Sequence, residues 1–230
     1  MRVAALHDVH GNLPALEAVL GDVEREHVDA IVFGGDIASG VMPRETVELV
    51  RSLDAVFIRG NADRVDSPAM SPEHDLARRW VETQLDDEQI SWLANLDFSV
   101  VLDDTLYVHA TPQDDLTVIT EVTSDERLAE LLDGVEQSRV VAGHTHMQLD
   151  RTIGSIRFVN AGSVGMPYEG KPGAYWAILD DDVELRRTEY DLERAAAAFR
   201  ATSHPLAEHL AADNILVVPS REEAIAMFGG

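Results

Sequence analysis

The chain of 230 residues contains no cysteine. Disulfide bonds, thiolate zinc sites and cysteine nucleophiles are therefore excluded. Long apolar runs are also missing. Residues 1–6 lead directly into His7 and Asp8, so neither a signal-peptide pattern nor a membrane-spanning pattern is present there. We expect a soluble, cytoplasmic protein that has no membrane partner.

Basic residues are scarce. Lys171 is the only lysine, and 18 Lys and Arg residues stand against 42 Asp and Glu residues, which gives a net charge of −24 at pH 7. A saline habitat and a codon bias are both compatible with this composition. An acidic surface repels nucleic acid at long range, so no long nucleic acid is expected as a partner. If the substrate is anionic, a local positive charge is needed, and bound metal could supply it.

The order of apolar segments predicts an α/β protein with a substantial core, since 45% of the residues are hydrophobic. Short runs at 3–6, 30–33 and 55–58 alternate with amphipathic segments, the first capped by Asn12, which is typical of parallel β-α-β units. Later runs predict a strand at 139–142 and hairpins at 98–109, 148–159 and 174–190. We predict two mixed β-sheets packed face to face and flanked by helices, a four-layer αββα sandwich.

The other segments are predicted to be loops and helices. Residues 64–74, with Pro68 and Pro72, are predicted as a loop, followed by helices at about 75–85, 87–96 and 124–132. We therefore expect one domain at 1–190, with a small helical insertion at about 64–97. Residues 191–230 are predicted to form a helical tail that packs on the domain, covers it as a lid, or contacts a second copy in a homo-oligomer.

Metal-binding side chains follow the predicted strands directly: Asp8 and His10, Asp36, Asn61 and Asp63, His109, and His144 and His146. In open α/β sheets, ligands bind at the carboxyl ends of strands. The members of the pairs Asp8/His10 and His144/His146 are two residues apart, so in an extended segment each pair would reach one ion from one side. Imidazole with carboxylate and amide oxygen suits Mn, Fe, Co, Ni or Zn. Each motif alone is common in turns, but their conjunction favours a metal site.

These motifs resemble those of the calcineurin-like metallophosphoesterase superfamily: Asp8-Val9-His10, Gly35-Asp36, Gly60-Asn61-Ala62-Asp63, His109 and Gly143-His144-Thr145-His146. The short chain and the segment 160–167 resemble its small bacterial and archaeal phosphodiesterase branch. The resemblance covers roughly residues 1–190. It implies a pair of mixed sheets between helices, which agrees with the fold expected from the apolar pattern.

The resemblance also implies two divalent metal ions, with manganese as the first candidate and iron, nickel, cobalt, zinc or magnesium as alternatives. It assigns Asp8, His10 and His146 to the first ion, Asn61, His109 and His144 to the second, and Asp36 to a bridge between them. A water activated by both ions would hydrolyse a small phosphate ester, as in a phosphodiesterase or phosphatase. Two alternatives stay open: a catalytically silent protein-interaction scaffold of the same fold, and a metal-binding or sensing protein without turnover.

One position departs from the family pattern. Many members have His directly after the motif Asn, where it contacts phosphate or helps the leaving group; here the residue is Ala62, followed by the expected Asp63. Arg64 and His74 are possible substitutes, because an Arg can bind phosphate oxygens bidentately. An ion pair between Arg64 and an Asp is an equally open interpretation. The catalytic candidates are thus Asp36, Asn61, His109, Asp63 and Arg64.

Further residues receive weaker interpretations. His7 stands where the family usually has a small hydroxyl residue, and a packing or surface role is favoured for it over a role behind the ligands. His27, His204 and His209 fit no ligand spacing and are interpreted as structural. Met166 and Tyr168 are candidates for the border of a substrate pocket.

Overall fold

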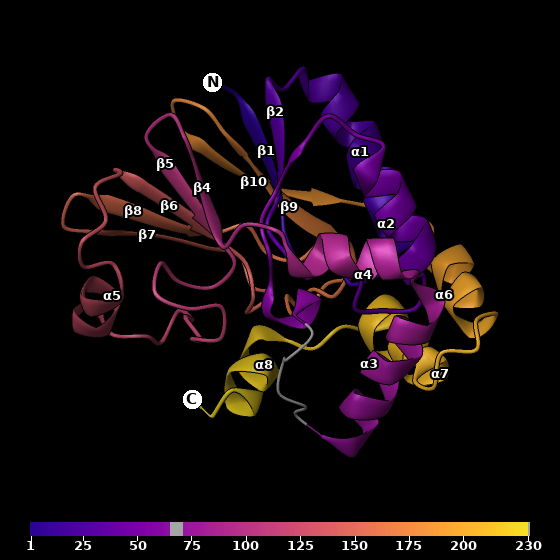
Figure 1. Cartoon of the computed structure of the whole chain (residues 1–230). Helices are drawn as coiled ribbons and strands as arrows, with labels where there is room; N and C mark the ends of the chain where they lie inside the picture. The colour runs from indigo at the N-terminus through magenta and orange to yellow at the C-terminus, as the bar shows by residue number, and fades with distance from the viewer. Residues whose placement is uncertain (65–70, 230) are drawn as a thin grey trace.

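The computed structural model describes residues 1–64 and 71–229, which form two five-stranded sheets and eight α-helices (Figure 1). The first sheet has the order β10-β9-β1-β2-β3 and the second the order β4-β5-β6-β8-β7. The strands are β1 Val3–Leu6, β2 Ala30–Phe33, β3 Val56–Phe57, β4 Ser99–Leu102, β5 Thr105–Val108, β6 Arg139–Ala142, β7 Leu149–Ile153, β8 Ile156–Asn160, β9 Ala174–Leu179 and β10 Val183–Thr188.

The first two helices alternate with β1, β2 and β3, as expected. The helices are α1 Leu13–Glu26, α2 Pro43–Arg51, α3 Pro72–Gln84, α4 Asp87–Ala94, α5 Asp125–Leu131, α6 Leu192–Arg200, α7 Ala207–Leu210 and α8 Arg221–Met227. A short 3-10 helix spans Asn61–Asp63, and a π-helical segment, Ala211–Leu216, follows α7. No helix among the described residues is both long enough and apolar enough to cross a membrane.

Both sheets are mixed. Strands β1, β2 and β3 pair in parallel, as do β5, β6 and β8, while β9 and β10 and the edge strands β4 and β7 pair antiparallel to their neighbours. The predicted hairpins are confirmed. Strand β8 also pairs in parallel with β6, which joins the hairpin of β7 and β8 to the rest of the second sheet.

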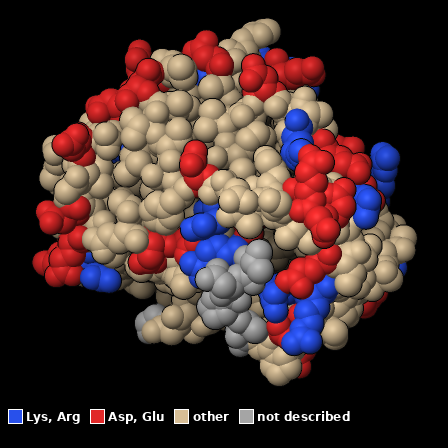
Figure 2. Space-filling model, viewed as in Figure 1, with Lys and Arg blue, Asp and Glu red and all other residues tan. Residues whose placement is uncertain are grey.

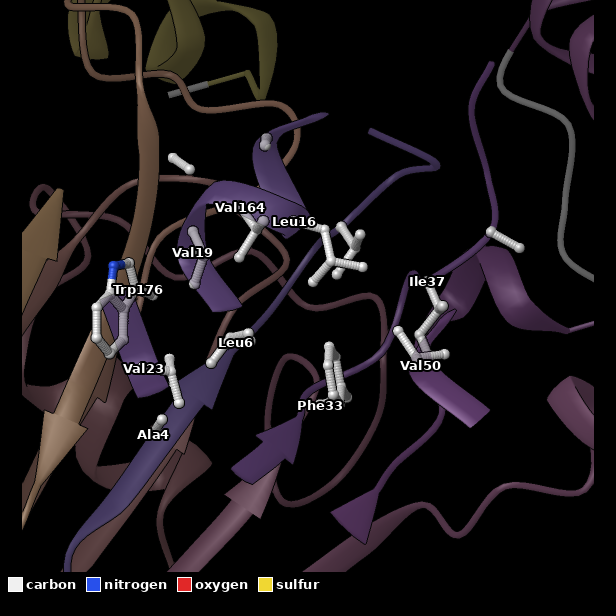
Figure 3. Close-up of a cluster of buried hydrophobic side chains, with 14 of the residues drawn as sticks. Ala4, Leu6, Leu16, Val19, Val23, Phe33, Ile37, Val50, Val164 and Trp176 are labelled. Carbon is white, nitrogen blue, oxygen red and sulfur yellow. The ribbon is translucent and has the colours of Figure 1, made fainter. Parts of the chain in front are cut away.

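The side chains of β1 show why the sheets form layers. Ala4 and Leu6 point into a cluster with α1, shown in Figure 3 with Leu16 and Trp176. Their neighbours in the sequence belong to a second cluster, which lies between the sheets and includes Tyr107 of β5. A third cluster packs the outer face of the second sheet on α5. Since alternate residues of a strand face opposite sides, these clusters give the predicted order of helices, sheet, sheet and helix.

Helix α3 begins earlier than the sequence suggested. The Ser71 hydroxyl accepts a hydrogen bond from the backbone N–H of His74, and Pro72 occupies the first helical position, where its missing N–H costs nothing. The prediction of a loop through residue 74 was therefore wrong at its end, and its residues 65–70 lie outside the described part. Helix α4 begins with a capping box formed by Asp86 and Gln89.

The C-terminal helices pack on the body of the molecule. Phe199 of α6 and Ile215 join Val41 in a buried cluster. In Figure 1, α3, α6, α7 and α8 gather on the side away from the N-terminus, beyond the carboxyl ends of β1 and β2. On the face seen in Figure 2, Asp and Glu side chains surround most of the rim, with Lys and Arg in small groups between them.

Candidate metal centre

The polar residues that follow β1, β2, β3, β5 and β6 meet at one end of the sandwich. Two hydrogen bonds join the loops of the two sheets there. Nδ1 of His109 donates to the carbonyl of Gly34 at 2.9 Å, and the backbone N–H of His144 donates to Oδ2 of Asp8 at 2.8 Å. The sheets therefore bring together side chains that lie more than a hundred residues apart in the sequence.

A first cluster contains Asp8, His10 and His146, all buried. Nε2 of His10 lies 3.1 Å from Nε2 of His146, which is 3.4 Å from Oδ1 of Asp8. A second group forms around Asp36, whose Oδ2 is 3.6 Å from Nε2 of His109 and 3.7 Å from Nε2 of His10. The Asp36 carboxylate thus lies between the two histidines, one from each sheet.

Asn61 and His144 complete the second group. One terminal atom of the Asn61 amide lies 3.0 Å from Nε2 of His109 and 2.9 Å from Nδ1 of His144. The rings of His109 and His144 are 5.1 Å apart. All seven residues proposed as ligands from the resemblance are therefore brought together, in the two groups that it implied.

Backbone carbonyls fix the tautomers of the four histidines. In three of them Nδ1 is the donor: His10 donates to the carbonyl of Ser39, His109 to that of Gly34 and His146 to that of Met166. In His144 the donor is Nε2, and the acceptor is the carbonyl of Leu116. The four distances are 2.7–3.1 Å. A carbonyl only accepts, so these nitrogens carry the proton. The other nitrogen of each ring then turns a lone pair toward the cluster, as a metal ligand requires.

This arrangement fits bound cations. The lone pairs of His10 and His146 face each other at 3.1 Å, and Oδ1 of Asp8 is buried without a hydrogen-bond partner among the described residues. Both features are unfavourable unless a positive charge lies between the groups. Two ligands on one ion, each about 2.1 Å from it, stand roughly 3–3.5 Å apart, close to the distances in the first cluster.

Burial and neighbouring charges shift the pKa values of these groups. Burial opposes ionisation of Asp8, but His146, His109 and His10 outweigh it and hold the pKa of this carboxyl well below its ordinary value. Burial and the proximity of His109 lower the pKa of His144 to about 4. For His109, burial is outweighed by Asp36 and Asp8, and the pKa is raised. Burial therefore favours the neutral form of His144, whereas the carboxylates of Asp36 and Asp8 favour the protonated form of His109.

The backbone at the site is unusual. Five of the seven proposed ligands have a positive φ, between 47° and 67°: Asp8, His10, Asp36, His144 and His146. Residues other than glycine seldom adopt this region, and such strain concentrates at functional sites. These segments are therefore not extended, and the prediction that each i, i+2 pair reaches one ion was wrong for His144 and His146, although Asp8 and His10 do lie in one cluster. His146 joins His10, whereas His144 turns to His109 and Asn61.

Two glycines give the carboxylates room. A Cβ at Gly60 would collide with the Asp36 carboxylate, and one at Gly143 would collide with the Asp8 carboxylate. Gly60 has an ordinary extended backbone, with φ −95° and ψ 176°. Glycine is therefore required at this position because a side chain would not fit, and not because the backbone is unusual.

Asp63 and Arg64 are not among the described residues that line the cavity over the centre. The Asp63 carboxylate accepts hydrogen bonds from the backbone N–H groups of Asp36, Ile37 and Gly60 at 2.7–3.0 Å, and burial together with Asp36 raises its pKa to about 7. The Arg64 guanidinium donates to Asp115 at 3.0 Å. Catalytic roles for Asp63 and Arg64 stay predictions. The contacts of Asp63 indicate that it positions the loop carrying Asp36.

His7 is fully buried, with its ring against Gly34, so the packing interpretation is correct and the surface one is not. Burial lowers its pKa to about 4. Sequence reasoning could find the packing role only from the neighbouring apolar run, because the partner of the ring lies 27 residues away.

A cavity of about 410 Å³ opens over the clusters. His10, Asp36, Asn61, His144 and His146 line its floor, and Met166 and Tyr168 line it too, where the sequence analysis placed a pocket border. Helix α3 and residues 204–228 supply most of the remaining lining, which we call the roof. The roof includes His74, and also His204 and His209, which were interpreted as structural. Their spacing gave no signal of this position, because two helices, α3 and α7, and the segment before α7 bring them there.

Comparisons with known proteins agree with this site. A family model described as the calcineurin-like phosphoesterase superfamily domain matches residues 1–182. An uncharacterized protein of Methanocaldococcus jannaschii, MJ0912, is 25% identical over 223 residues, covering 84% of this chain and 89% of the relative. The phosphodiesterase YfcE of Escherichia coli K12 is 24% identical over 195 residues, covering 80% of this chain and 89% of the relative.

Two solved structures are similar over nearly their whole length. A metallophosphoesterase from Sphaerobacter thermophilus has 29% identity and a TM-score of 0.78, covering 94% of this chain and 98% of that one. The hypothetical protein PH1004 from Pyrococcus horikoshii OT3 has 20% identity and a TM-score of 0.81, covering 91% of this chain and 97% of that one. The second supports the fold alone.

Proposed function

This chain belongs to the calcineurin-like phosphoesterase superfamily, and we propose that it is a metal-dependent hydrolase of small phosphate esters, a phosphodiesterase or a phosphatase. The observation that carries the proposal is the pair of inward-facing nitrogens of His10 and His146, 3.1 Å apart. Beside them lies Oδ1 of Asp8, which has no hydrogen-bond partner in the described part of the chain. The printed names of a phosphodiesterase and a metallophosphoesterase among the relatives support it.

The proposed metal ligands form two sets. Asp8, His10 and His146 would hold one divalent ion, Asn61, His109 and His144 the other, and Asp36 both. Manganese is the first candidate, and iron, nickel, cobalt, zinc and magnesium are the alternatives, since mixed nitrogen and oxygen donors suit the middle of the divalent series. Bound ions would lower the pKa of a shared water and offset charge on the phosphate oxygens.

The chain's own residues orient the ligands and shape the cavity. The four carbonyl partners hold each imidazole with one nitrogen inward, and three backbone N–H groups bind Asp63 and so position the loop of Asp36. Ala62 offers no proton to a leaving group. An ester whose leaving group is a stable anion would need none, so such esters are the proposed substrates.

The test measures hydrolysis of bis-p-nitrophenyl phosphate and p-nitrophenyl phosphate after metal removal and after addition of Mn, Ni, Co or Mg. His146→Asn is compared with His27→Asn, because both positions have a positive φ, 58° and 51°, which Asn tolerates. His27 is exposed at the end of α1. We expect activity restored by metal, lost in His146→Asn and kept in His27→Asn.

Two outcomes would contradict the proposal. Activity that persists in the metal-free protein would exclude metal dependence. A folded protein that binds two ions and hydrolyses neither ester would instead support metal sensing without turnover or an interaction scaffold. The faster of the two substrates distinguishes a phosphodiesterase from a phosphatase.

A further inference from the structure

The cavity over the candidate metal centre has a polar floor and an apolar roof. The floor contains the proposed metal ligands. The roof presents apolar side chains from three helices and the segments beside them, among them Val81, Leu206, Leu210, Met227 and Phe228. The phosphate of a substrate would bind the floor, so the rest of the substrate must lie against this apolar surface.

The described part of the roof contains no unpaired Arg or Lys. Among the described lining residues, Arg78 is the only Arg or Lys, and its guanidinium is bound to Asp75 at 2.8 Å and to Glu82 at 2.5 Å. Asp213 is paired with His209 at 2.8 Å. A second phosphate or a carboxylate on the substrate would therefore be desolvated without a partner, which is costly.

Several polar groups of the roof have no hydrogen-bond partner among the described residues: Nδ1 of His74, Nε of Arg78 and the side-chain amide of Asn214. Asn214 is 9% exposed, lines the cavity, and its side chain makes no hydrogen bond with the described residues. It lies in the π-helical segment after α7, a type of distortion that is frequent at functional sites. An amide both donates and accepts, so Asn214 suits an uncharged polar edge of a ligand.

The two parts of the roof are joined to each other, and α8 is fixed to the body of the molecule. The indole N–H of Trp80 on α3 donates to Ser203 at 3.2 Å, and its ring packs on His204. On α8, Arg221 donates to Glu169 at 2.9 Å and to the carbonyl of Gln148 at 3.0 Å. These contacts hold the apolar side chains at a set distance from the floor, as selection by size and polarity requires.

We propose that the substrate is a phosphate ester of one uncharged, mainly apolar organic group that occupies the roof while its phosphate lies on the floor. The inference rests on the proposed hydrolase function and adds a substrate class to it. A volume of about 410 Å³ suits a ligand of modest size. Substrates with a second anionic group on the organic side are excluded by the same geometry.

The test uses three diesters that share the p-nitrophenolate leaving group and differ in the second group: methyl, phenyl and 4-carboxyphenyl. Rates are divided by those of hydroxide hydrolysis, which removes electronic differences. Because a phenyl ring buries much more apolar area than a methyl group, kcat/KM should be at least about tenfold higher for phenyl than for methyl. The carboxyphenyl ester should lose roughly that tenfold gain.

Leu210→Ala should lower the phenyl-to-methyl ratio by about fivefold, since it removes apolar surface from the roof. Leu76→Ala is the matched control: Leu76 lies on α3, is 56% exposed and is not part of the lining, so the ratio should not change. Hydrolysis of all three esters at equal normalised rates by the wild-type protein would overturn the inference and leave the hydrolase proposal intact. Hydrolysis of none of them, with any metal, would remove the hydrolase proposal itself.

Discussion

Gly60 offers the sharpest test of how the site is built. A methyl group at this position would overlap the Asp36 carboxylate and also its backbone nitrogen. The backbone of Gly60 has φ −95° and ψ 176°, which alanine adopts freely, so Gly60→Ala adds steric conflict without conformational strain. Overpacking of a rigid site costs about 1–3 kcal/mol. We expect Gly60→Ala to lower the free energy of unfolding by an amount near the upper end of this range, because the backbone nitrogen of Asp36 cannot rotate away as a side chain can.

The displaced group is the carboxylate proposed to be shared by both ions. A shift that disturbs ligand orientation lowers metal affinity by roughly 10- to 100-fold. The free energy of unfolding is measured by urea denaturation in chelator, and manganese affinity by calorimetry. Gly21→Ala is the control: its Cβ would approach only Arg25, at 3.9 Å, and in a helix alanine stabilises by about 1 kcal/mol over glycine. The reasoning is refuted if Gly60→Ala matches the wild-type protein in both quantities.

Three further predictions concern metal, pH and a helix cap. Free manganese at a thousand times its Kd should add about 4 kcal/mol per site to the free energy of unfolding, which raises Tm by roughly 10 °C. Calorimetry would measure this shift, and a chelator should reverse it. An unchanged Tm would contradict metal binding. Burial lowers the pKa of His204 to about 4, so the buried neutral ring stabilises the fold fully above pH 6.5. Up to about 3 kcal/mol of the free energy of unfolding is lost as the pH falls from 6.5 to 4. Urea denaturation at pH 7 and pH 4.5 should therefore show a smaller effect of pH on the free energy of unfolding in His204→Gln than in the wild-type protein. Asn12→Ala removes the cap of α1 and the hydrogen bond to the Gly165 carbonyl, and should lower the free energy of unfolding by about 2 kcal/mol. Asn12→Ser should retain most of the cap. Equal free energies of unfolding for the two variants would contradict this prediction.

Much of the fold follows from the sequence because its apolar periods are strong. Strand β1 has the predicted limits, and its alternation between two cores is a property of four consecutive residues. The start of α3 was misplaced because Ser71 and Pro72 were assigned to the loop, although a capping serine followed by proline is a helix start. Local signals were sufficient there and were misinterpreted.

The site was predicted in its composition better than in its geometry. Apolar strands that end in Asp, Asn or His indicated where the ligands lie. The sequence could not indicate the positive φ of Asp8 or His144, because steric preference disfavours it and only the surrounding fold enforces it. Nor could it indicate that Arg64 pairs with Asp115, 51 residues away. Long-range pairings of this kind depend on how the sheets stack.

The roof was beyond local reasoning for a related reason. The apolar faces of α3 and of the C-terminal helices showed that they bury something, but an amphipathic helix does not identify its partner. Only the assembled molecule places Val81 and Leu210 over the same floor.

The division between floor and roof makes chemistry and selectivity separable by mutation. The proposed ligands lie between residues 8 and 146, whereas most of the roof comes from 74–81 and 204–228. A change in the roof can therefore alter which ester is accepted without touching any proposed ligand. Related chains could diverge in substrate by drift in these two segments alone, and a directed-evolution library restricted to them would search for new substrates while keeping the hydrolytic centre constant.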